Sequence, residues 1–136
     1  MAGRGVAGLS LVLALVLLGA VGCDEGPSDH ATIAIRYSHF EPAVVEVPAG
    51  EPVTIILRND DPIEHEWMVG SPEMHARHRT GTEPYHDSIP TEVTVPAFST
   101  RTTTIQFDKP GDYAYICHLP NHEAYGMVGT LRVVAG

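Results

Sequence analysis

Cysteine is scarce in this chain, which has two in 136 residues, Cys23 and Cys117. Exported proteins usually hold their cysteines in pairs as disulfides. If Cys23 is consumed by another modification, Cys117 is left as a single thiol that needs a different purpose, and metal binding is a good one. The alternative is a disulfide between Cys23 and Cys117, which would tie the N-terminal segment to the rest of the chain.

Basic residues are also few, with eight Lys and Arg against 17 Asp and Glu and a formal net charge of −9 at pH 7. An acidic surface is repelled by the phosphate backbone of nucleic acids and by anionic lipid headgroups. We therefore expect no nucleic acid among the partners of this chain, and we expect any protein partner to dock through a basic face.

The N-terminus has an apolar run that is short for a membrane span, which needs about 20 apolar residues. Residues 9–18 form this run after Arg4, and small residues follow it, so residues 1–23 are predicted to be a secretory signal peptide. Ala20-Val-Gly-Cys23 also resembles a bacterial lipobox, which implies cleavage before Cys23 and lipidation of its thiol. An ordinary signal peptide cut nearby is the alternative. We expect an exported protein, in the periplasm or on the outer face of the cell membrane, attached to the membrane by this lipid anchor only.

The remaining chain contains no repeat, no low-complexity tract and no heptad pattern. Residues 24–30 are a short polar tether, and residues 31–136 have the length of one domain. Short runs with alternating or β-branched residues are separated there by turn residues, which predicts an all-β sandwich of seven or eight strands, antiparallel or mixed. The expected strands are residues 32–36, 43–47, 52–58, 65–69, 92–95, 100–107, 111–117 and 127–134.

Residues 71–90 are the exception to the β pattern. Ser71 is a good N-cap, Pro72 suits the first helical position, and Glu73 places a negative charge in the first turn. We therefore predict a short helical insertion that ends near Arg79, followed by an irregular loop.

Three metal donors follow one another at intervals of five residues near the C-terminus: the thiol of Cys117, the imidazole of His122 and the thioether of Met127. A trigonal site of two His and one Cys with a weak axial Met is a type 1 (blue) copper centre. This loop supplies three of the four ligands, so one imidazole must come from elsewhere in the chain.

His65 is the best candidate for the missing imidazole. It follows a predicted turn at residues 59–62 and opens the next strand, where it shares a face with Trp67 and Val69. The side chain would therefore point into one end of the sandwich, beside apolar neighbours.

These features resemble the cupredoxin family of small blue copper proteins. The matching features are Phe40-Glu-Pro42 leading to Val47-Pro-Ala-Gly50, a His after a central strand, and Cys117-x₄-His122-x₄-Met127 before a final strand. The similarity covers about residues 31–135, and the loop spacing is most similar to the auracyanin and rusticyanin branch. The resemblance implies a Greek-key β-sandwich that holds one type 1 copper ion through His65, Cys117, His122 and Met127.

The resemblance also implies a function. We expect a monomeric electron carrier, not an enzyme, that exchanges one electron with redox protein partners. The alternative from a different class is a copper chaperone or sensor that collects metal with the His- and Met-bearing segment 71–90. Zinc also remains open as the ion, because a set of two His and one Cys accepts zinc with Met127 unbound.

Two residues depart from the usual pattern. Glu66 stands where the family commonly has Asn or Ser, and we expect its side chain to face solvent, with tuning of the reduction potential as the alternative. His118 follows Cys117 directly. In multicopper oxidases, a His directly after the Cys binds a copper cluster. Because Ile116 replaces the His that those enzymes need before the Cys, we expect His118 to face outward near an electron exit.

Three further histidines, His75, His78 and His86, lie with Met74 in segment 71–90. On a helix, His75 and His78 are neighbours on one face. The segment is therefore either a second, exchangeable metal site or a polar, solvated loop.

Overall fold

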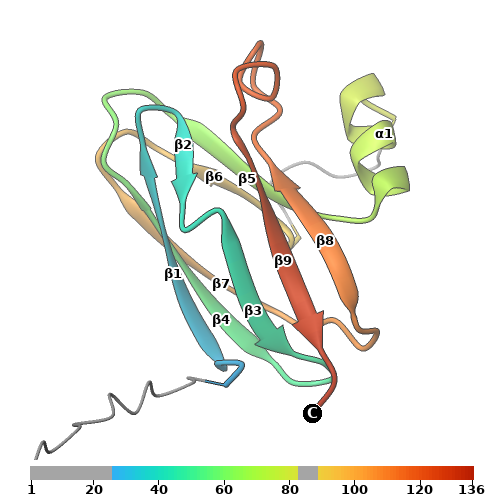
Figure 1. Ribbon diagram of the computed structural model, residues 1–136. Coiled ribbons are helices and arrows are strands. Elements are labelled where there is room, and N and C mark those ends of the chain that lie inside the picture. The colour runs from blue at the N-terminus through green and yellow to red at the C-terminus, as the bar shows by residue number, and fades with distance from the viewer. Residues whose placement is uncertain (1–25, 83–88) are drawn as a thin grey trace, which may run out of the picture.

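Alternating side chains build two facing sheets, which form a β-sandwich in the computed structural model (Figure 1). The structure describes residues 26–82 and 89–136. Within them, one sheet has the strand order β2-β1-β4-β7 and the other the order β3-β9-β8-β5-β6. In chain order the elements are β1 (His30–Arg36), β2 (His39–Glu41), β3 (Val44–Pro48), β4 (Val53–Asn59), β5 (His65–Gly70), α1 (Pro72–Thr80), β6 (Glu92–Val95), β7 (Thr100–Ile105), β8 (Gly111–Ile116) and β9 (Val128–Val134).

The predicted all-β sandwich with one short helix is confirmed. The sheets are mixed, because β1 pairs with β4 and β3 pairs with β9 in parallel, whereas the other pairs are antiparallel. All eight predicted strands are present with ends shifted by at most two residues, and β2 is an additional strand that the prediction missed.

The core fills the space between the two sheets. Strand β4 illustrates the pattern, because Val53, Ile55 and Leu57 are buried while the residues between them are more exposed. Trp67 and Val69 of β5 are fully buried and meet this layer from the other sheet. Complete burial of such a side chain contributes about 1.5–3 kcal/mol, so the core gives a rigid frame on which loops at the sandwich ends can be held.

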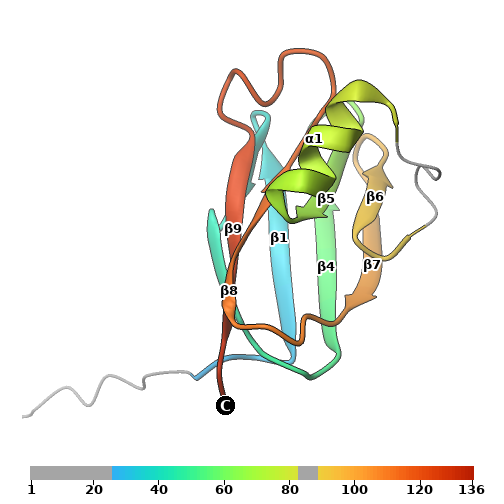
Figure 2. The same cartoon turned by 90° about the vertical axis from the view of Figure 1, so that its right-hand side faces the viewer.

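Helix α1 begins where the sequence predicts. The Ser71 hydroxyl accepts a hydrogen bond from the backbone N–H of Met74, Pro72 occupies the first turn, and Gly81 ends the helix in the left-handed region at φ 62°. The helix lies over the outer face of the sheet that contains β5 and β8 (Figure 2). Gly70 permits this close approach, because a Cβ there would lie 2.8 Å from the sulfur of Met74.

The loop between β8 and β9 projects at the end of the sandwich opposite the C-terminus (Figure 1). The β1–β2 turn and the loop between β4 and β5 lie at the same end. This end therefore brings together His65, which begins β5, and the segment that contains Cys117, His122 and Met127.

None of the helices in the described part of the chain is long and apolar enough to cross a membrane. The predicted signal peptide, the lipidation site Cys23 and His86 lie outside the described residues. The signal peptide and the lipid anchor stay predictions.

Candidate metal centre

The loop between β8 and β9 is closed by its own backbone. The N–H of Cys117 donates to the carbonyl of Met127 at 3.2 Å, and the N–H of Met127 donates to the carbonyl of His122 at 3.0 Å. Asn121 and Gly126 have positive φ values of 70° and 95°, which make the two tight turns on either side of His122. These bonds fix the three predicted loop ligands relative to one another.

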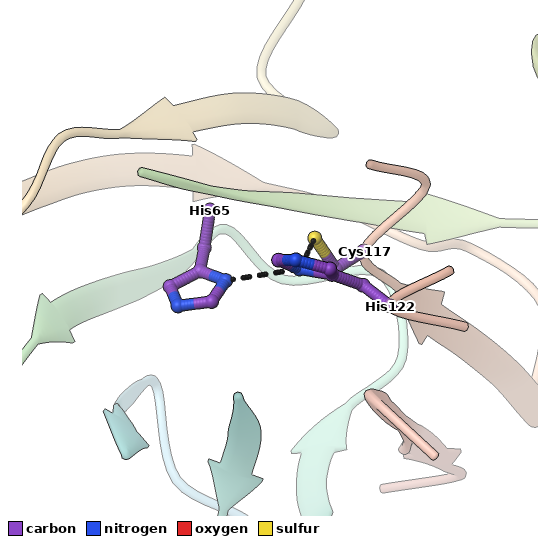
Figure 3. Close-up of side chains that lie close together, drawn as sticks. All are labelled: His65, Cys117 and His122. Atoms are coloured by element: carbon purple, nitrogen blue, oxygen red, sulfur yellow. Dashed lines mark hydrogen bonds between the residues drawn. The ribbon is translucent and has the colours of Figure 1, made fainter. Parts of the chain in front are cut away.

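Three predicted ligands converge at this end of the sandwich (Figure 3). The donor atoms of His65, Cys117 and His122 all lie within 4.8 Å of one another. His122 Nδ1 is 3.3 Å from Cys117 Sγ and 3.3 Å from His65 Nδ1. Met127, the fourth predicted ligand, is fully buried in the same apolar cluster as Cys117. The set contains two imidazoles, one thiol and a neighbouring thioether, which is the donor chemistry that copper favours.

Asp61 orients the His65 ring, a role that the sequence analysis missed. Its carboxylate lies 2.9 Å from His65 Nε2, so Nδ1 of the ring faces Cys117 and His122. The same carboxylate accepts hydrogen bonds from the backbone N–H groups of Tyr37 at 2.7 Å and Ser38 at 2.8 Å. A carboxylate on the second nitrogen of a metal-binding His is a common arrangement in metal sites. The sequence signal for this role is an acid four residues before His65, within the predicted turn at residues 59–62.

Burial sets the protonation of these groups. It lowers the pKa of His65, and the neighbouring Asp61 offsets this only in part, so the ring is neutral and able to act as a ligand. Although burial opposes it, the hydrogen bonds from Ser38 and Tyr37 hold the pKa of Asp61 below its ordinary value. Asp61 is therefore ionised near neutral pH.

The thiol of Cys117 is free and buried, and burial raises its pKa. The backbone N–H of Glu66 points at the sulfur at 3.4 Å and favours the thiolate. A buried thiolate needs a cation beside it, and a coordinating metal ion deprotonates the thiol outright. The residues present therefore fit a copper ion, and the same three donors also fit zinc.

Comparison with known families decides the assignment. Residues 9–131 match the family model described as a cupredoxin-like domain. The chain belongs to the cupredoxin-like family. Its fold and its His-Cys-His donor set together support copper binding.

Two curated relatives of this cupredoxin share a name. The copper-resistant cuproprotein CopI of Rubrivivax gelatinosus is 33% identical over 97 residues, which cover 69% of this chain and 59% of the relative. The copper-resistant cuproprotein CopI of Pseudomonas aeruginosa is 27% identical over 128 residues, with 70% of each chain covered. This cupredoxin thus spans less than two thirds of the length of the first relative.

Solved structures agree on the fold. Reduced auracyanin from Roseiflexus castenholzii superposes with a TM-score of 0.67 at 22% identity, covering 80% of this cupredoxin and 99% of that chain. Auracyanin A from Chloroflexus aurantiacus gives 0.63 at 25% identity, covering 80% and 100%. Rusticyanin from Thiobacillus ferrooxidans gives 0.57 at 20% identity, covering 77% and 76%. The expected likeness to auracyanin and rusticyanin is confirmed at the level of the fold.

The expectation that Glu66 faces solvent is wrong. Its side chain is 14% exposed, and its carboxylate accepts a hydrogen bond from the backbone N–H of His118 at 3.2 Å. The carboxylate also lies 3.2 Å from Nε2 of His78 on α1. Glu66 does point away from Cys117, as strand alternation requires, but α1 occupies the space where solvent was expected.

The expectation for His118 is wrong for the same reason. Its side chain is 5% exposed, and its ring lies under α1 against His75 and His78 of this cupredoxin, with ring centroids 5.1 Å and 4.8 Å away. Nε2 of His118 is 2.9 Å from Nδ1 of His75. His118 therefore belongs to a covered cluster on the outer face of the sheet.

Proposed function

We propose that this cupredoxin carries single electrons on one type 1 copper ion, held by His65, Cys117 and His122 with Met127 as the weak axial ligand. The convergence of the two imidazoles and the thiol within 4.8 Å carries this proposal. Copper bound there supplies a reversible step between Cu(I) and Cu(II). The closed loop and the Asp61 contact hold the donors in place, which keeps rearrangement small when the charge changes.

His122 gives the electron a route to the surface. Of the four proposed ligands it is the half-buried one, whereas the other three are fully buried. Large apolar side chains are exposed on the loops at this end of the sandwich: Tyr37, Ile63, Phe98 and Tyr125. Exposed apolar side chains that gather on one face mark a protein contact surface. We therefore place the docking site for redox partners here, and the net charge of −9 favours partners with a basic face.

The visible spectrum of the protein loaded with one equivalent of copper tests this function. We expect a strong thiolate-to-copper absorption band and reversible one-electron reduction, and we expect the Cys117→Ser variant to lose the band. A copper-loaded protein without the band, or a band that survives in Cys117→Ser, would overturn the assignment. Metal analysis of the same sample shows whether zinc has taken the site.

The names of the two curated relatives support a second candidate function, a copper-handling protein that contributes to copper resistance. A chaperone or sensor must give up its ion, whereas an electron carrier retains it. Titration of the copper-loaded protein with a Cu(I) chelator separates the two. Fast and complete transfer of copper favours handling, and retention of copper through many redox cycles favours electron transfer.

We also propose that the protein is exported and anchored by a lipid on Cys23, on the basis of residues 1–23 alone. Expression of the full chain in a bacterium followed by membrane fractionation tests the anchor. The wild type is expected in the membrane fraction and the Cys23→Ser variant in the soluble periplasmic fraction. Equal distribution of the two proteins would exclude lipid attachment at Cys23.

A further inference from the structure

A second cluster of metal-donor side chains lies on the outer face of the sheet, beneath α1. It consists of Glu66 on β5, Glu92 on β6 and His78 on α1, whose donor atoms all lie within 4.8 Å of one another. We infer that this cluster binds one divalent transition-metal ion, zinc or Cu(II), through oxygen and nitrogen ligands. This site is separate from the proposed type 1 centre and does not depend on it.

The two strands place both carboxylates on one face. Strands β5 and β6 are antiparallel neighbours, with Glu66 opposite Thr94 and Met68 opposite Glu92. Glu66 and Glu92 are therefore diagonal neighbours, a separation of roughly 7–8 Å that long side chains can bridge. His78 approaches from the helix above them, with Nε2 3.2 Å from Glu66 and Nδ1 3.8 Å from Glu92.

The cluster is covered, which distinguishes it from ordinary surface charge. The side chains of Glu66, His78 and Glu92 are 14%, 7% and 2% exposed. Two carboxylates at such low exposure repel each other, and burial together with the charge of Glu92 raises the pKa of Glu66. A divalent cation bound by both carboxylates offsets both effects at once.

The donor types indicate which ion fits. Two carboxylates and one imidazole suit zinc or Cu(II), and divalent affinity for nitrogen and oxygen sites rises toward copper. His118 supplies a further imidazole next to the cluster, with its ring 4.8 Å from that of His78. The absence of sulfur among the three donors sets this site apart from the set that contains Cys117.

Glu66 borders both sites through different atoms. Its backbone N–H points at Cys117 Sγ, whereas its carboxylate points to the opposite face of the sheet and toward His78. The two ions would therefore lie on opposite sides of one strand. Occupation of the second site can then be measured independently, while the copper absorption band reports on the first.

Zinc binding to the copper-loaded protein tests the inference. The protein is loaded with one equivalent of copper, dialysed against micromolar Zn²⁺, and analysed for both metals. We expect one zinc per chain in addition to the copper. Glu92→Gln and His78→Gln, which remove one ligand each, are expected to weaken zinc binding by about tenfold or more. Glu46→Gln removes an exposed carboxylate on β3 and is expected to leave zinc binding unchanged.

The outcomes separate this site from the type 1 centre. An unchanged copper band in Glu92→Gln and His78→Gln shows that both variants fold. Zinc can instead replace copper at Cys117. In that case the Cys117→Ser protein still binds one zinc ion, and adding Glu92→Gln to that protein removes it. The inference then stands even though the proposed function fails. No zinc beyond the Cys117 site in the wild type, or zinc retained in both ligand variants, would overturn the inference.

Discussion

The carboxylate of Asp61 lies 2.9 Å from Nε2 of His65, and this contact decides which nitrogen of the ring faces Cys117. Asp61 also accepts the N–H groups of Tyr37 and Ser38 through its side chain and the N–H of Phe98 through its backbone carbonyl. One residue thus ties the β1–β2 turn and the β6–β7 loop to a proposed copper ligand.

Replacement of Asp61 by Ala is expected to weaken copper binding by about 10–100-fold, because it frees the His65 ring to rotate. It also removes two hydrogen bonds from the backbone N–H groups of Tyr37 and Ser38, each worth about 0.5–1.5 kcal/mol. Chelator competition and urea unfolding measure the two effects. Asp60→Ala is the matched control, since Asp60 is more exposed and pairs with Arg36 and Arg58. Equal losses in both variants would show that Asp61 has no special role.

Met127→Leu tests the axial ligand. Leu has a similar size and remains apolar, so the fully buried position should be filled with little loss of stability, less than about 1.5 kcal/mol. Loss of the thioether removes a donor that stabilises Cu(II), so we expect a higher reduction potential with the absorption band retained. Cyclic voltammetry of the two proteins measures the change. An unchanged potential would mean that Met127 does not contact the copper.

The strands were predictable because each carries its own alternation of buried and exposed residues. Strand β2 was missed since it has three residues and follows a turn in which Tyr37 and Ser38 have positive φ values. Neither residue is a glycine, so no glycine marks that turn in the sequence. Its geometry depends instead on hydrogen bonds to Asp61, which is more than twenty residues away.

The candidate site was predictable to about the same extent as the strands. What covers the outer face of the sheet beside it was not predictable. The equal spacing of Cys117, His122 and Met127 identifies the loop, and strand alternation correctly turns Glu66 and His118 away from it. Alternation cannot show what lies on the outer face of a sheet. The position of α1 over that face follows from packing between distant segments, such as His75 of α1, whose Nε2 lies 3.0 Å from the carbonyl oxygen of Ala114 on β8. Two residues expected in solvent are therefore covered.

Gly129→Ala tests the packing behind the copper loop. Gly129 on β9 lies opposite Tyr115 on β8, and a Cβ there would come within 2.1 Å of the Tyr115 ring. The ring is fully buried and its hydroxyl donates to the carbonyl of Pro42 at 2.7 Å, so it cannot move without losing that bond. We expect a loss of about 3 kcal/mol in the free energy of unfolding. Gly26→Ala, where nothing lies within 4 Å of the added Cβ, is the control. Similar stability of the two variants would show that the ring adapts.

The stability of the metal-free protein should depend on pH through the buried ring of His118. Burial, with neighbouring His75 and His78, lowers the pKa of His118 to about 4, whereas an unfolded histidine titrates near 6.5. Between these values the unfolded chain holds a proton that the folded chain lacks, so acidification favours unfolding. Above about pH 7, His118 should therefore not lower the free energy of unfolding. Between pH 6.5 and 4 it should lower that free energy increasingly, by up to about 3 kcal/mol.

A difference measurement isolates this effect, because other groups titrate in the same range. Glu66 acts in the opposite direction, since burial raises its pKa and the folded state takes up a proton first. The groups that act on His118 are His75, His78 and Arg79 on α1 and Glu123 in the β8–β9 loop. Urea unfolding at several pH values gives the difference in the free energy of unfolding between wild type and His118→Gln. This difference is expected to be constant above pH 7. Below pH 6.5 it should shift steadily in favour of the variant. A difference that does not change down to pH 4 would mean that His118 keeps its ordinary pKa beneath the helix.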